Sequence, residues 1–280
     1  MNYRHAYHAG NFADVHKHAA LALILEHLKR KDAPFAYVDS HAGIGAYDLG
    51  SVQAEKTGEW LGGIAKVMAA ADIPEEMTPF LDVVRGMNPD GGLRHYPGSP
   101  MIAAKLARDC DRLALCELHP DDAAELRQRF HHDRRVGVHH RDGYDGLKAL
   151  LPPPERRGLV LIDPPFEVRD EFDRMRKGLI QAMKRWPTGL YALWYPIKAK
   201  ALVDRFHADL TQIGLPKTLA ADIWIRDGDD PTRLNGCGLV VVNPPWMLDE
   251  AMGRLMPWLA ATLGEDGAHS RLQWVVPEKG

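Results

Sequence analysis

Several features that would define the class of this protein at once are scarce or missing. Three cysteines among 280 residues (Cys110, Cys116, Cys237) are too few and too scattered for a disulfide framework or a zinc site, which favours a reducing compartment. No apolar run approaches the roughly 20 residues that a membrane span needs, and the first residues lack the pattern of a secretory signal. We therefore expect a cytoplasmic protein with no membrane partner.

Strong charge of either sign is missing as well. The net charge of -3 excludes a protein that holds nucleic acid by bulk positive charge, although it leaves room for a local basic face. The hydrophobic share of 45% and charged share of 26% are those of a globular chain, long enough for one large domain or two modest ones. The candidate phosphate contacts are Arg4, Lys17, Arg94, Arg169, Lys198 and Lys200.

Short apolar runs alternate with longer helical patterns along most of the chain. This alternation predicts βαβ units and an α/β fold with a mostly parallel sheet, in which ligands bind beyond the carboxyl ends of the strands. The predicted strands are residues 35–38, 112–116, 136–140, 158–162, 190–195, 218–225 and 239–242. The predicted helices are residues 12–27, 121–130, 171–186, 199–213 and 249–263.

One stretch departs from this alternation. Residues 51–94 show short helical patterns separated by glycine and proline, with no convincing strand. We interpret them as a helical subdomain inserted into a main domain of residues 1–50 and 95–280, whose first 30 residues are an N-terminal segment and a helix. A surface excursion without a function of its own remains the alternative.

The first predicted strand ends in Asp39-Ser40-His41-Ala42-Gly43-Ile44-Gly45. Glycines at this place let the backbone approach a ligand closely, although Gly43 and Gly45 could also be simple turn residues. A dinucleotide fingerprint would need a third glycine in time, and none is present. Glu117 ends the second strand, where an acid suits the ribose diol of nicotinamide and adenosylmethionine cofactors alike.

A second motif, Asp163-Pro164-Pro165-Phe166, follows the fourth predicted strand. An exocyclic amine of a base is a poor nucleophile because its lone pair is delocalised into the ring. A carboxylate and a fixed backbone carbonyl that both accept hydrogen bonds from the amine can direct that lone pair toward a methyl donor, and a stacked aromatic ring orients the base. Asp163, the carbonyl of Pro164 and Phe166 meet these three needs and are the predicted catalytic residues.

Two other stretches are further candidates for a functional motif. Asn243-Pro244-Pro245-Trp246 follows the last predicted strand, but its amide is a poorer proton acceptor, and we interpret it as a rigid strand exit covered by the indole. The N-terminal residues 3–14 interleave aromatic and basic side chains, which suits a flexible nucleic acid. Their histidines come without a thiolate or carboxylate pattern, so no metal site is predicted.

With these motifs in view, the whole chain resembles the bacterial 23S ribosomal RNA adenine N6-methyltransferases. The N-terminal block from Tyr3 to Asn11 is the most specific part of this resemblance, since Asp-Pro-Pro-Phe alone would indicate only an amino-methyltransferase. The other matching segments are Thr57–Glu59, Tyr96–Pro100, Glu117–Pro120, Leu161–Pro165, Ala192–Pro196 and Asn243–Trp246.

The resemblance implies a Rossmann-like class I methyltransferase fold with a seven-stranded sheet, S-adenosylmethionine as donor, and N6 of one adenosine of 23S rRNA as acceptor. It implies an RNA that is protein-free or at an early stage of assembly, with no obligate protein partner. The residues implied to contact the donor are His18, His41, Ser99, Glu117, Asp142, Gly143 and Asp163. Asp163 would also be the catalytic acceptor, Glu117 would bind the ribose diol, Asp142 the adenine amine of the donor, and Tyr3 the RNA.

One departure and several alternatives remain. Phe166 stands where close members of the family carry tyrosine, a change that keeps stacking but removes the hydrogen bond of the phenol. A DNA adenine or protein glutamine amino-methyltransferase is an alternative within the same fold class. An RNA-binding protein without chemistry and a nicotinamide oxidoreductase are alternatives from other classes, disfavoured by the acidic strand ends and by the missing third glycine respectively.

Overall fold

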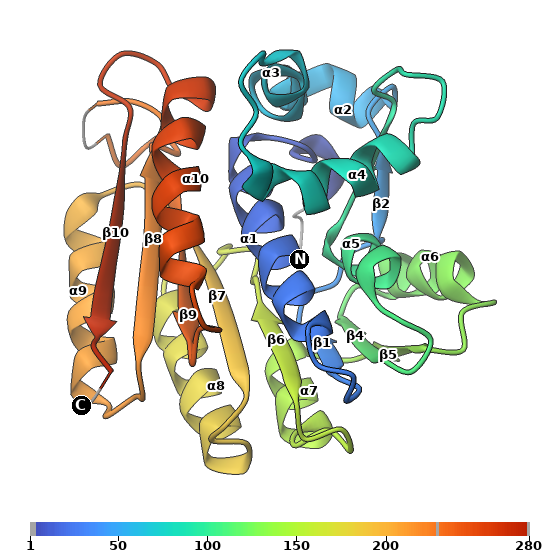
Figure 1. Ribbon diagram of the computed structural model, residues 1–280, viewed down its shortest axis with the longest axis vertical. Helices are drawn as coiled ribbons and strands as arrows, with labels where there is room; N and C mark the ends of the chain where they lie inside the picture. The colour runs from blue at the N-terminus through green and yellow to red at the C-terminus, as the bar shows by residue number, and fades with distance from the viewer. Residues whose placement is uncertain (1–3, 228–229, 279–280) are drawn as a thin grey trace.

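A central sheet of eight strands organises the molecule, for which a computed structural model describes residues 4–227 and 230–278. The strands follow the order β10-β8-β9-β7-β6-β1-β4-β5 across the sheet (Figure 1). They are β1 (Ala36–Asp39), β4 (Arg112–Glu117), β5 (Val136–His140), β6 (Gly158–Ile162), β7 (Leu190–Ile197), β8 (Thr218–Trp224), β9 (Gly236–Val242) and β10 (His269–Val276).

Strand direction follows the expected pattern of a mostly parallel sheet. Strands β5, β4, β1, β6 and β7 pair in parallel, whereas β9 runs antiparallel to both of its neighbours, β7 and β8. Five consecutive parallel strands therefore bring their carboxyl ends to one edge of the sheet, where the sequence predicts the site.

All seven predicted strands are present, but the predicted count of seven is wrong by one. Strand β10 pairs antiparallel with β8, and its side chains are half-buried or exposed, so it has no continuous apolar run. Its ladder with β8 holds it in place, and Arg271 adds ion pairs, because its guanidinium donates to Asp222 (Nη2–Oδ2 2.7 Å) and to Asp204 (2.9 Å). A half-exposed edge strand gives a weaker sequence signal than a strand that is buried on both faces.

Helices cover both faces of the sheet, and the five predicted ones are present within a few residues of their expected ends. Two further short helices, α5 and α7, were not predicted. The helices that pack on the sheet are α1 (Phe12–Lys29), α5 (Ser99–Leu106), α6 (Pro120–Phe130), α7 (Gly143–Leu150), α8 (Glu171–Arg185), α9 (Lys200–Gln212) and α10 (Leu248–Leu263). No helix in the described part of the chain combines the length and the apolar character that a membrane crossing requires.

Two hydrophobic clusters hold these layers together. One lies between the sheet and helices α1, α5, α6 and α10, and the other between the sheet and α7, α8 and α9. Alternate residues of β1 divide between them, since Tyr37 belongs to the first cluster and Val38 to the second. This period of two is what a strand buried on both faces requires, and it fixes the register of β1 in the centre of the sheet.

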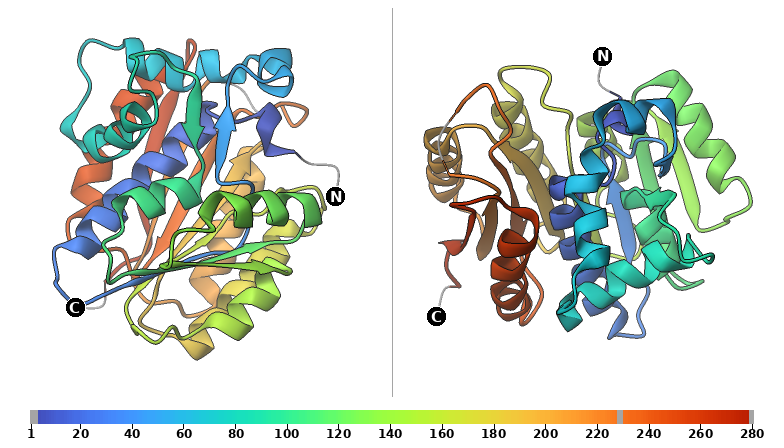
Figure 2. Two further views of the ribbon diagram at one scale, coloured as in Figure 1. Left: turned by 90° about the vertical axis from the view of Figure 1, so that its right-hand side faces the viewer. Right: turned by 90° about the horizontal axis from the view of Figure 1, so that it is seen from above.

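Residues 51–94 form short helices and no strand. They contain α2 (Val52–Thr57), α3 (Ile64–Ala69) and α4 (Thr78–Gly86), with 3-10 turns η2 (Glu59–Gly62) and η3 (Glu75–Met77). The antiparallel pair β2 (Ala46–Asp48) and β3 (His95–Pro97) connects this stretch to the rest of the chain, and α4 packs on α1 (Figures 1 and 2). The stretch therefore sits above α1, next to the N-terminal turn η1 (His5–Tyr7).

Candidate active site

A cavity of about 550 Å³ opens at the carboxyl ends of β1, β4 and β6. Register explains why these ends meet, since Asp39 of β1 pairs with Leu115 of β4 and with Leu161 of β6. Every predicted site residue within the described part of the chain lines this cavity; they are His18, His41, Ser99, Glu117, Asp142, Gly143, Asp163, Pro164 and Phe166. Tyr3 lies outside the described residues.

The end of β1 is organised by the buried carboxylate of Asp39. It accepts hydrogen bonds from the hydroxyls of Tyr37 and Ser99, both at 2.7 Å, and burial raises its pKa to about 6. The turn that follows needs its glycines, because Gly43 and Gly45 adopt φ of 62° and 84°. The strand therefore ends in a tight turn whose backbone reaches the cavity.

Glu117 presents an oriented carboxylate to the same cavity. One oxygen accepts from the amide of Gly43 at 2.8 Å, and the other accepts from the amide of His119 at 2.7 Å. Burial raises the pKa of this carboxyl group, although the two backbone hydrogen bonds oppose that shift. Each oxygen keeps a further lone pair, so the group can accept hydrogen bonds from two hydroxyls of a diol.

Asp142 and Gly143 begin helix α7 at the cavity. Asp142 caps the helix, because its Oδ1 accepts from the amides of Tyr144 at 2.9 Å and Asp145 at 3.2 Å. A Cβ at Gly143 would lie 2.1 Å from the carbonyl oxygen of Ser40, so no larger residue fits there. The other oxygen, Oδ2, lies 3.7 Å from the guanidinium of Arg174, and both side chains line the cavity.

Two histidines border the cavity as neutral rings. His18 is 1% exposed, and its Nδ1 shares a 2.9 Å hydrogen bond with the hydroxyl of Tyr96. Burial lowers the pKa of His18 well below its ordinary value and that of His41 to about 4. Both rings are therefore uncharged at neutral pH and can offer hydrogen bonds but no fixed positive charge.

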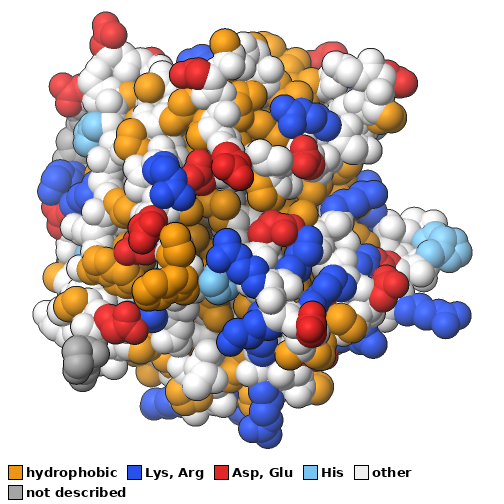
Figure 3. All heavy atoms as spheres, in the orientation of Figure 1, with side chains coloured by type: hydrophobic (Ala, Val, Ile, Leu, Met, Phe, Trp, Pro, Cys, Tyr) orange, Lys and Arg blue, Asp and Glu red, His pale blue; other side chains and the backbone are white. Residues whose placement is uncertain are grey.

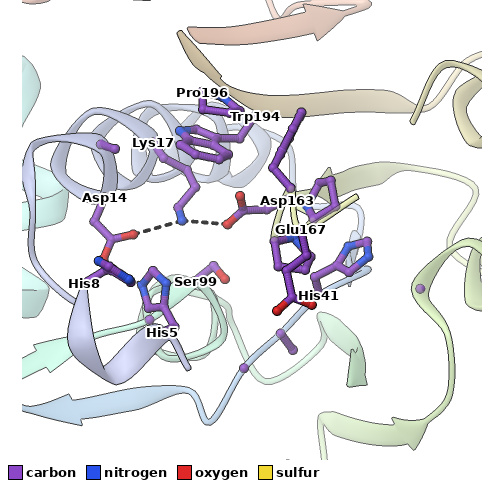
Figure 4. Close-up of a pocket in the computed structure, with 18 of the residues that line it drawn as sticks. His5, His8, Asp14, Lys17, His41, Ser99, Asp163, Glu167, Trp194 and Pro196 are labelled. Carbon is purple, nitrogen blue, oxygen red and sulfur yellow. Dashed lines mark hydrogen bonds and ion pairs between the residues drawn. The ribbon is translucent and has the colours of Figure 1, made fainter. Parts of the chain in front are cut away.

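Asp163, which follows β6, forms an ion pair with Lys17 of helix α1 that the sequence did not predict. The ammonium of Lys17 donates to Oδ2 of Asp163 at 2.6 Å and to Oδ1 of Asp14 at 2.9 Å (Figure 4). Lys17 is 5% exposed, so its predicted role as a phosphate contact is wrong. Sequence spacing could not reveal this contact, since 146 residues separate Lys17 from Asp163.

Electrostatics keeps Lys17 and Asp14 ionised. Burial alone would lower the pKa of Lys17, but Asp14 and Asp163 outweigh it and raise that pKa well above the ordinary value. Burial would likewise raise the pKa of Asp14, which the charges of His5 and Lys17 instead hold well below its usual range. Within the described residues, Oδ1 of Asp163 accepts no hydrogen bond from the protein, which leaves this oxygen available to a ligand.

Aromatic rings form the wall beside Asp163. Ile162 pairs with Leu193, so Asp163 leaves the sheet beside Trp194 of β7. Phe166 adopts φ of 48°, rare for a residue with a side chain, and its ring makes edge contacts with Phe172 (5.0 Å between centroids) and Trp194 (6.0 Å). Packing thus holds a strained backbone so that an aromatic ring lines the cavity.

The competing motif lies at the opposite end of the sheet. Val242 pairs with Tyr191 and Thr218, near the starts of β7 and β8, so the antiparallel strand β9 carries Asn243 away from the cavity. The Asn243 amide donates to the carbonyls of Pro187 (3.0 Å) and Gly189 (2.8 Å), a structural role. The expected indole cover is wrong, because Trp246 is 73% exposed.

Three of the candidate phosphate contacts are paired with carboxylates. Arg4 bonds Asp122, Arg94 bonds Asp48, and Lys200 bonds Asp204. Among the described residues, Lys198 and Arg169 make no ion pair, and Lys198 lines the cavity. Acidic side chains lie among the basic ones on the face shown in Figure 3, in agreement with the weak overall charge.

Together, these features define a class of protein. The sheet is Rossmann-like, Glu117 presents an oriented carboxylate at the end of β4, and the Asp-Pro-Pro-Phe motif follows β6. This combination is typical of a class I methyltransferase that acts on an amine. The donor set fits S-adenosylmethionine, since Glu117 can hold a diol and the acidic groups at the cavity suit a sulfonium cation.

Comparison with known proteins identifies the family. Residues 32–276 match the model of the family described as ribosomal RNA large subunit methyltransferase D, RlmJ, and the chain belongs to this family. It is 45% identical to the ribosomal RNA large subunit methyltransferase J of Escherichia coli (strain K12), over 99% of this chain and 100% of that one. The enzyme of the same description from Haemophilus influenzae is 43% identical over the same shares.

A solved structure supports the fold. The crystal structure of protein LPL1258 from Legionella pneumophila superposes with a TM-score of 0.88 at 34% identity, covering 95% of this chain and 98% of that one. Family and fold together confirm the expected enzyme class, a large-subunit rRNA methyltransferase of class I architecture with S-adenosylmethionine as donor.

Proposed function

We propose that this enzyme transfers a methyl group from S-adenosylmethionine to N6 of one adenosine of 23S rRNA, through the cavity at the ends of β1, β4 and β6. The observation that carries this assignment is the exit of β6. There, Oδ1 of Asp163 is open to the cavity beside the ring of Phe166 and the backbone of Pro164. The position matches the needs of a planar base that presents an amine, and the specificity agrees with the family.

On the acceptor side, the base leaves its stack and enters the cavity against Phe166, which supplies about 1–3 kcal/mol of stacking. The N6 amine donates one hydrogen bond to Oδ1 of Asp163 and one to the carbonyl of Pro164. These two contacts hold the amine out of conjugation with the ring and aim its lone pair. The ammonium of Lys17 donates to Oδ2 of Asp163, so Oδ1 is the oxygen that accepts from the amine.

The proton that N6 must lose then moves to Oδ1 of Asp163. A weak base is sufficient for this step, because the amine becomes strongly acidic once it carries an additional carbon and a positive charge. The ion pair with Lys17 therefore costs little at this stage, while it fixes the carboxylate in position before the reaction. Asp163 serves first as an orienting group and only afterwards as a base.

On the donor side, Glu117 binds the ribose diol and Asp142 the adenine amine. His18, His41, Ser99 and Gly143 complete the wall of that part of the cavity. When bound, S-adenosylmethionine supplies an electrophilic methyl group on a sulfonium. The buried carboxylate of Asp39 does not face the donor freely, since Tyr37 and Ser99 occupy it, and its role is to hold Ser99 in place.

The remaining expectations concern the RNA and the division of the chain. We assign residues 1–50 and 95–280 to the methyltransferase domain and residues 51–94 to an accessory subdomain. A base that enters the cavity must first swing out of its stack, which favours protein-free rRNA or an early assembly intermediate in the cytoplasm. Tyr3 stays a predicted RNA contact.

A transfer assay with labelled donor tests the assignment. Protein-free 23S rRNA, DNA and a release factor are offered in parallel, and the labelled nucleotide is then mapped. We expect label at N6 of a single adenosine of the RNA, and none in DNA or protein. Transfer to DNA or protein in place of RNA, or binding of donor and RNA without transfer, would overturn the proposal in favour of one of the alternatives.

A further inference from the structure

The N-terminal segment of residues 5–11 is tied to the 51–94 stretch rather than to the sheet. Thr57 donates its hydroxyl to the carbonyl of Tyr7, and the ammonium of Lys56 lies 5.9 Å from the centre of the Tyr7 ring. The amide of Ile64 donates to the carbonyl of Gly10 at 2.9 Å. These contacts place the segment at the rim of the cavity, which His5, His8 and Asn11 line.

One carboxylate makes two of the ties at once. Oε1 of Glu59 accepts from Nδ1 of His8 at 2.9 Å, and Oε2 accepts from Nδ2 of Asn11 at 2.9 Å. Glu59 itself lines the cavity, so it is the 51–94 residue that joins this subdomain to the site. A carboxylate that bridges two donors fixes both in one geometry, as a neutral side chain with one acceptor oxygen cannot.

From Asn11 the connection continues to the proposed catalytic carboxylate. The Asn11 side chain caps α1 by accepting from the amide of Asp14 at 3.0 Å. Asp14 in turn accepts from Lys17, and Lys17 donates to Asp163. Asp14 also accepts from His5 at 2.9 Å and from the amide of Gly10 at 2.9 Å, so both ends of the segment meet at this carboxylate.

Close packing leaves this arrangement little freedom. A Cβ at Gly63 would lie 2.1 Å from the carbonyl oxygen of Gly10 and 2.5 Å from the carbonyl carbon of Asn11. The two backbones therefore touch directly beside the Glu59 contacts. A shift of the segment away from the 51–94 stretch would break the hydrogen bonds of Glu59 and the cap of α1 together.

We propose that Glu59 is a positioning residue through which the 51–94 subdomain holds residues 5–11 over the acceptor side of the cavity and sets the Asp14–Lys17–Asp163 row. The inference rests on the proposed function, in which Asp163 and the neighbouring rim receive the acceptor base. Glu59 touches neither donor nor base in this assignment. It acts through His8 and Asn11, so its loss weakens acceptor binding and turnover while donor binding is preserved.

The test compares Glu59→Ala with Glu59→Gln and with Glu55→Ala, a matched control on an exposed position of α2. We expect Glu59→Ala to raise the KM for RNA about tenfold, the size of a lost charge-assisted hydrogen bond, and to lower kcat. The dissociation constant of S-adenosylmethionine, measured by calorimetry, should change less than twofold. Glu59→Gln should recover part of the RNA effect, because its amide oxygen still accepts from one donor.

Two readouts separate positioning from general destabilisation. Amide hydrogen exchange of residues 5–11 should accelerate in Glu59→Ala, while exchange of the sheet strands stays at the wild-type rate. A change of the RNA KM below twofold, or an equal loss of donor affinity, would overturn the inference. So would a Glu55→Ala effect as large as that of Glu59→Ala.

Failure of the proposed function is recognised separately. If the wild-type enzyme labels DNA or protein rather than RNA, the proposed acceptor is wrong, and the three variants are compared on the acceptor that is labelled. Under that result the positioning role still requires a raised KM for this acceptor with unchanged donor affinity. An unchanged KM then overturns the role of Glu59 independently of the identity of the acceptor.

Discussion

Two strands of the same sheet end in nearly the same residues, yet the two exits have different surroundings. Asp163-Pro164-Pro165-Phe166 follows β6, and Asn243-Pro244-Pro245-Trp246 follows β9. At both exits a residue with positive φ turns the chain, Phe166 at 48° and Asn243 at 54°. The first exit lines the cavity, whereas the second lies at the opposite end of the sheet.

Strand direction and electrostatic surroundings account for the difference. Strand β6 is parallel to its neighbours, so its carboxyl end joins theirs, but β9 runs the other way. At β6 the polar residue meets an ammonium and keeps one oxygen open, whereas at β9 it meets two carbonyls, which need a donor. An amide suits the second environment and a carboxylate the first, because only the amide can donate.

Replacing the β6 carboxylate should have the largest effect. Asp163→Asn keeps the shape of the side chain but places an NH2 group where Lys17 or the acceptor amine must donate. We expect methyl transfer to fall on the order of a thousand-fold, comparable to the loss of a preorganised polar contact at a reacting centre. A single-turnover assay with saturating RNA measures it, and Asn243→Asp, which should keep near wild-type turnover, is the matched control.

Wild-type turnover in Asp163→Asn would remove the functional contrast between the two exits. Loss of turnover in folded Asn243→Asp would also contradict this contrast, because it would give the β9 exit a role in catalysis. Donor binding in Asp163→Asn should be retained or weakened, since Glu117 and Asp142 still line the donor part of the cavity.

Removing the cation that distinguishes the β6 exit should have the next largest effect. Lys17→Met keeps the length of the side chain but leaves Asp14 and Asp163 buried together without their partner. Breaking a buried pair costs about 3–5 kcal/mol, so we expect a lower unfolding temperature and turnover reduced about a hundredfold. Thermal unfolding and single-turnover rates measure both effects. The control is Lys29→Met, which removes a half-buried lysine at the end of α1 that pairs with Glu26 away from the cavity.

The ion pair of Lys17 with Asp14 stabilises the fold over a defined pH range. The pKa of Lys17 is raised above 10.5, so its contribution is complete below that value and is lost only as pH rises through the higher folded value. The pKa of Asp14 is lowered below 3.8, so its contribution is complete above that value and is lost as pH falls through the lower folded one. In Lys17→Met the pKa of Asp14 rises, because burial is no longer opposed by the ammonium. The difference in stability between wild type and Lys17→Met should therefore grow as pH rises from acid and then level off, and a difference that falls with rising pH would contradict the assignment.

The aromatic residues of the two exits should also differ, by a smaller amount. Phe166→Ala removes the proposed stacking surface, so kcat/KM for RNA should fall by the equivalent of about 1–3 kcal/mol. Trp246→Ala removes an indole that is 73% exposed, and surface changes of this kind usually alter stability by less than about 0.5 kcal/mol. Phe166→Tyr should retain activity. Equal losses in the Phe166→Ala and Trp246→Ala enzymes would contradict the proposed division of roles.

The sequence was sufficient to predict residues that line one cavity, because the position of these residues is set by the ends of strands. Asp163 and Glu117 each follow an apolar run, and parallel pairing brings such ends to one edge. The same reasoning predicted seven strands and missed β10, an edge strand of half-buried and exposed residues whose Arg271 pairs with Asp222. An ion pair between residues 49 positions apart leaves no periodic pattern in the sequence.

Polar contacts between residues far apart in the chain could not be predicted from the sequence either. Lys17 looks like an exposed helical lysine in the sequence, and only packing of α1 against β6 makes it a partner of Asp163. Glu59 was recognised within a matching motif, but its partners His8 and Asn11 are 51 and 48 residues away. Trp246 was expected to cover its strand exit, and the structure exposes it.

Substitutions of Asn243 should have the smallest effect on catalysis, because this residue at the exit of β9 contributes to stability only. Asn243→Gly tolerates φ of 54° but loses the hydrogen bonds to Pro187 and Gly189, so we expect about 1–2 kcal/mol less stability in urea unfolding. Asn243→Ala loses the same bonds and must also adopt a left-handed backbone, which costs about 1 kcal/mol more. Turnover per folded molecule should stay at the wild-type value in both. If Asn243→Ala were as stable as Asn243→Gly, the two side-chain hydrogen bonds alone would explain the asparagine. The positive φ at this exit would then cost no measurable stability.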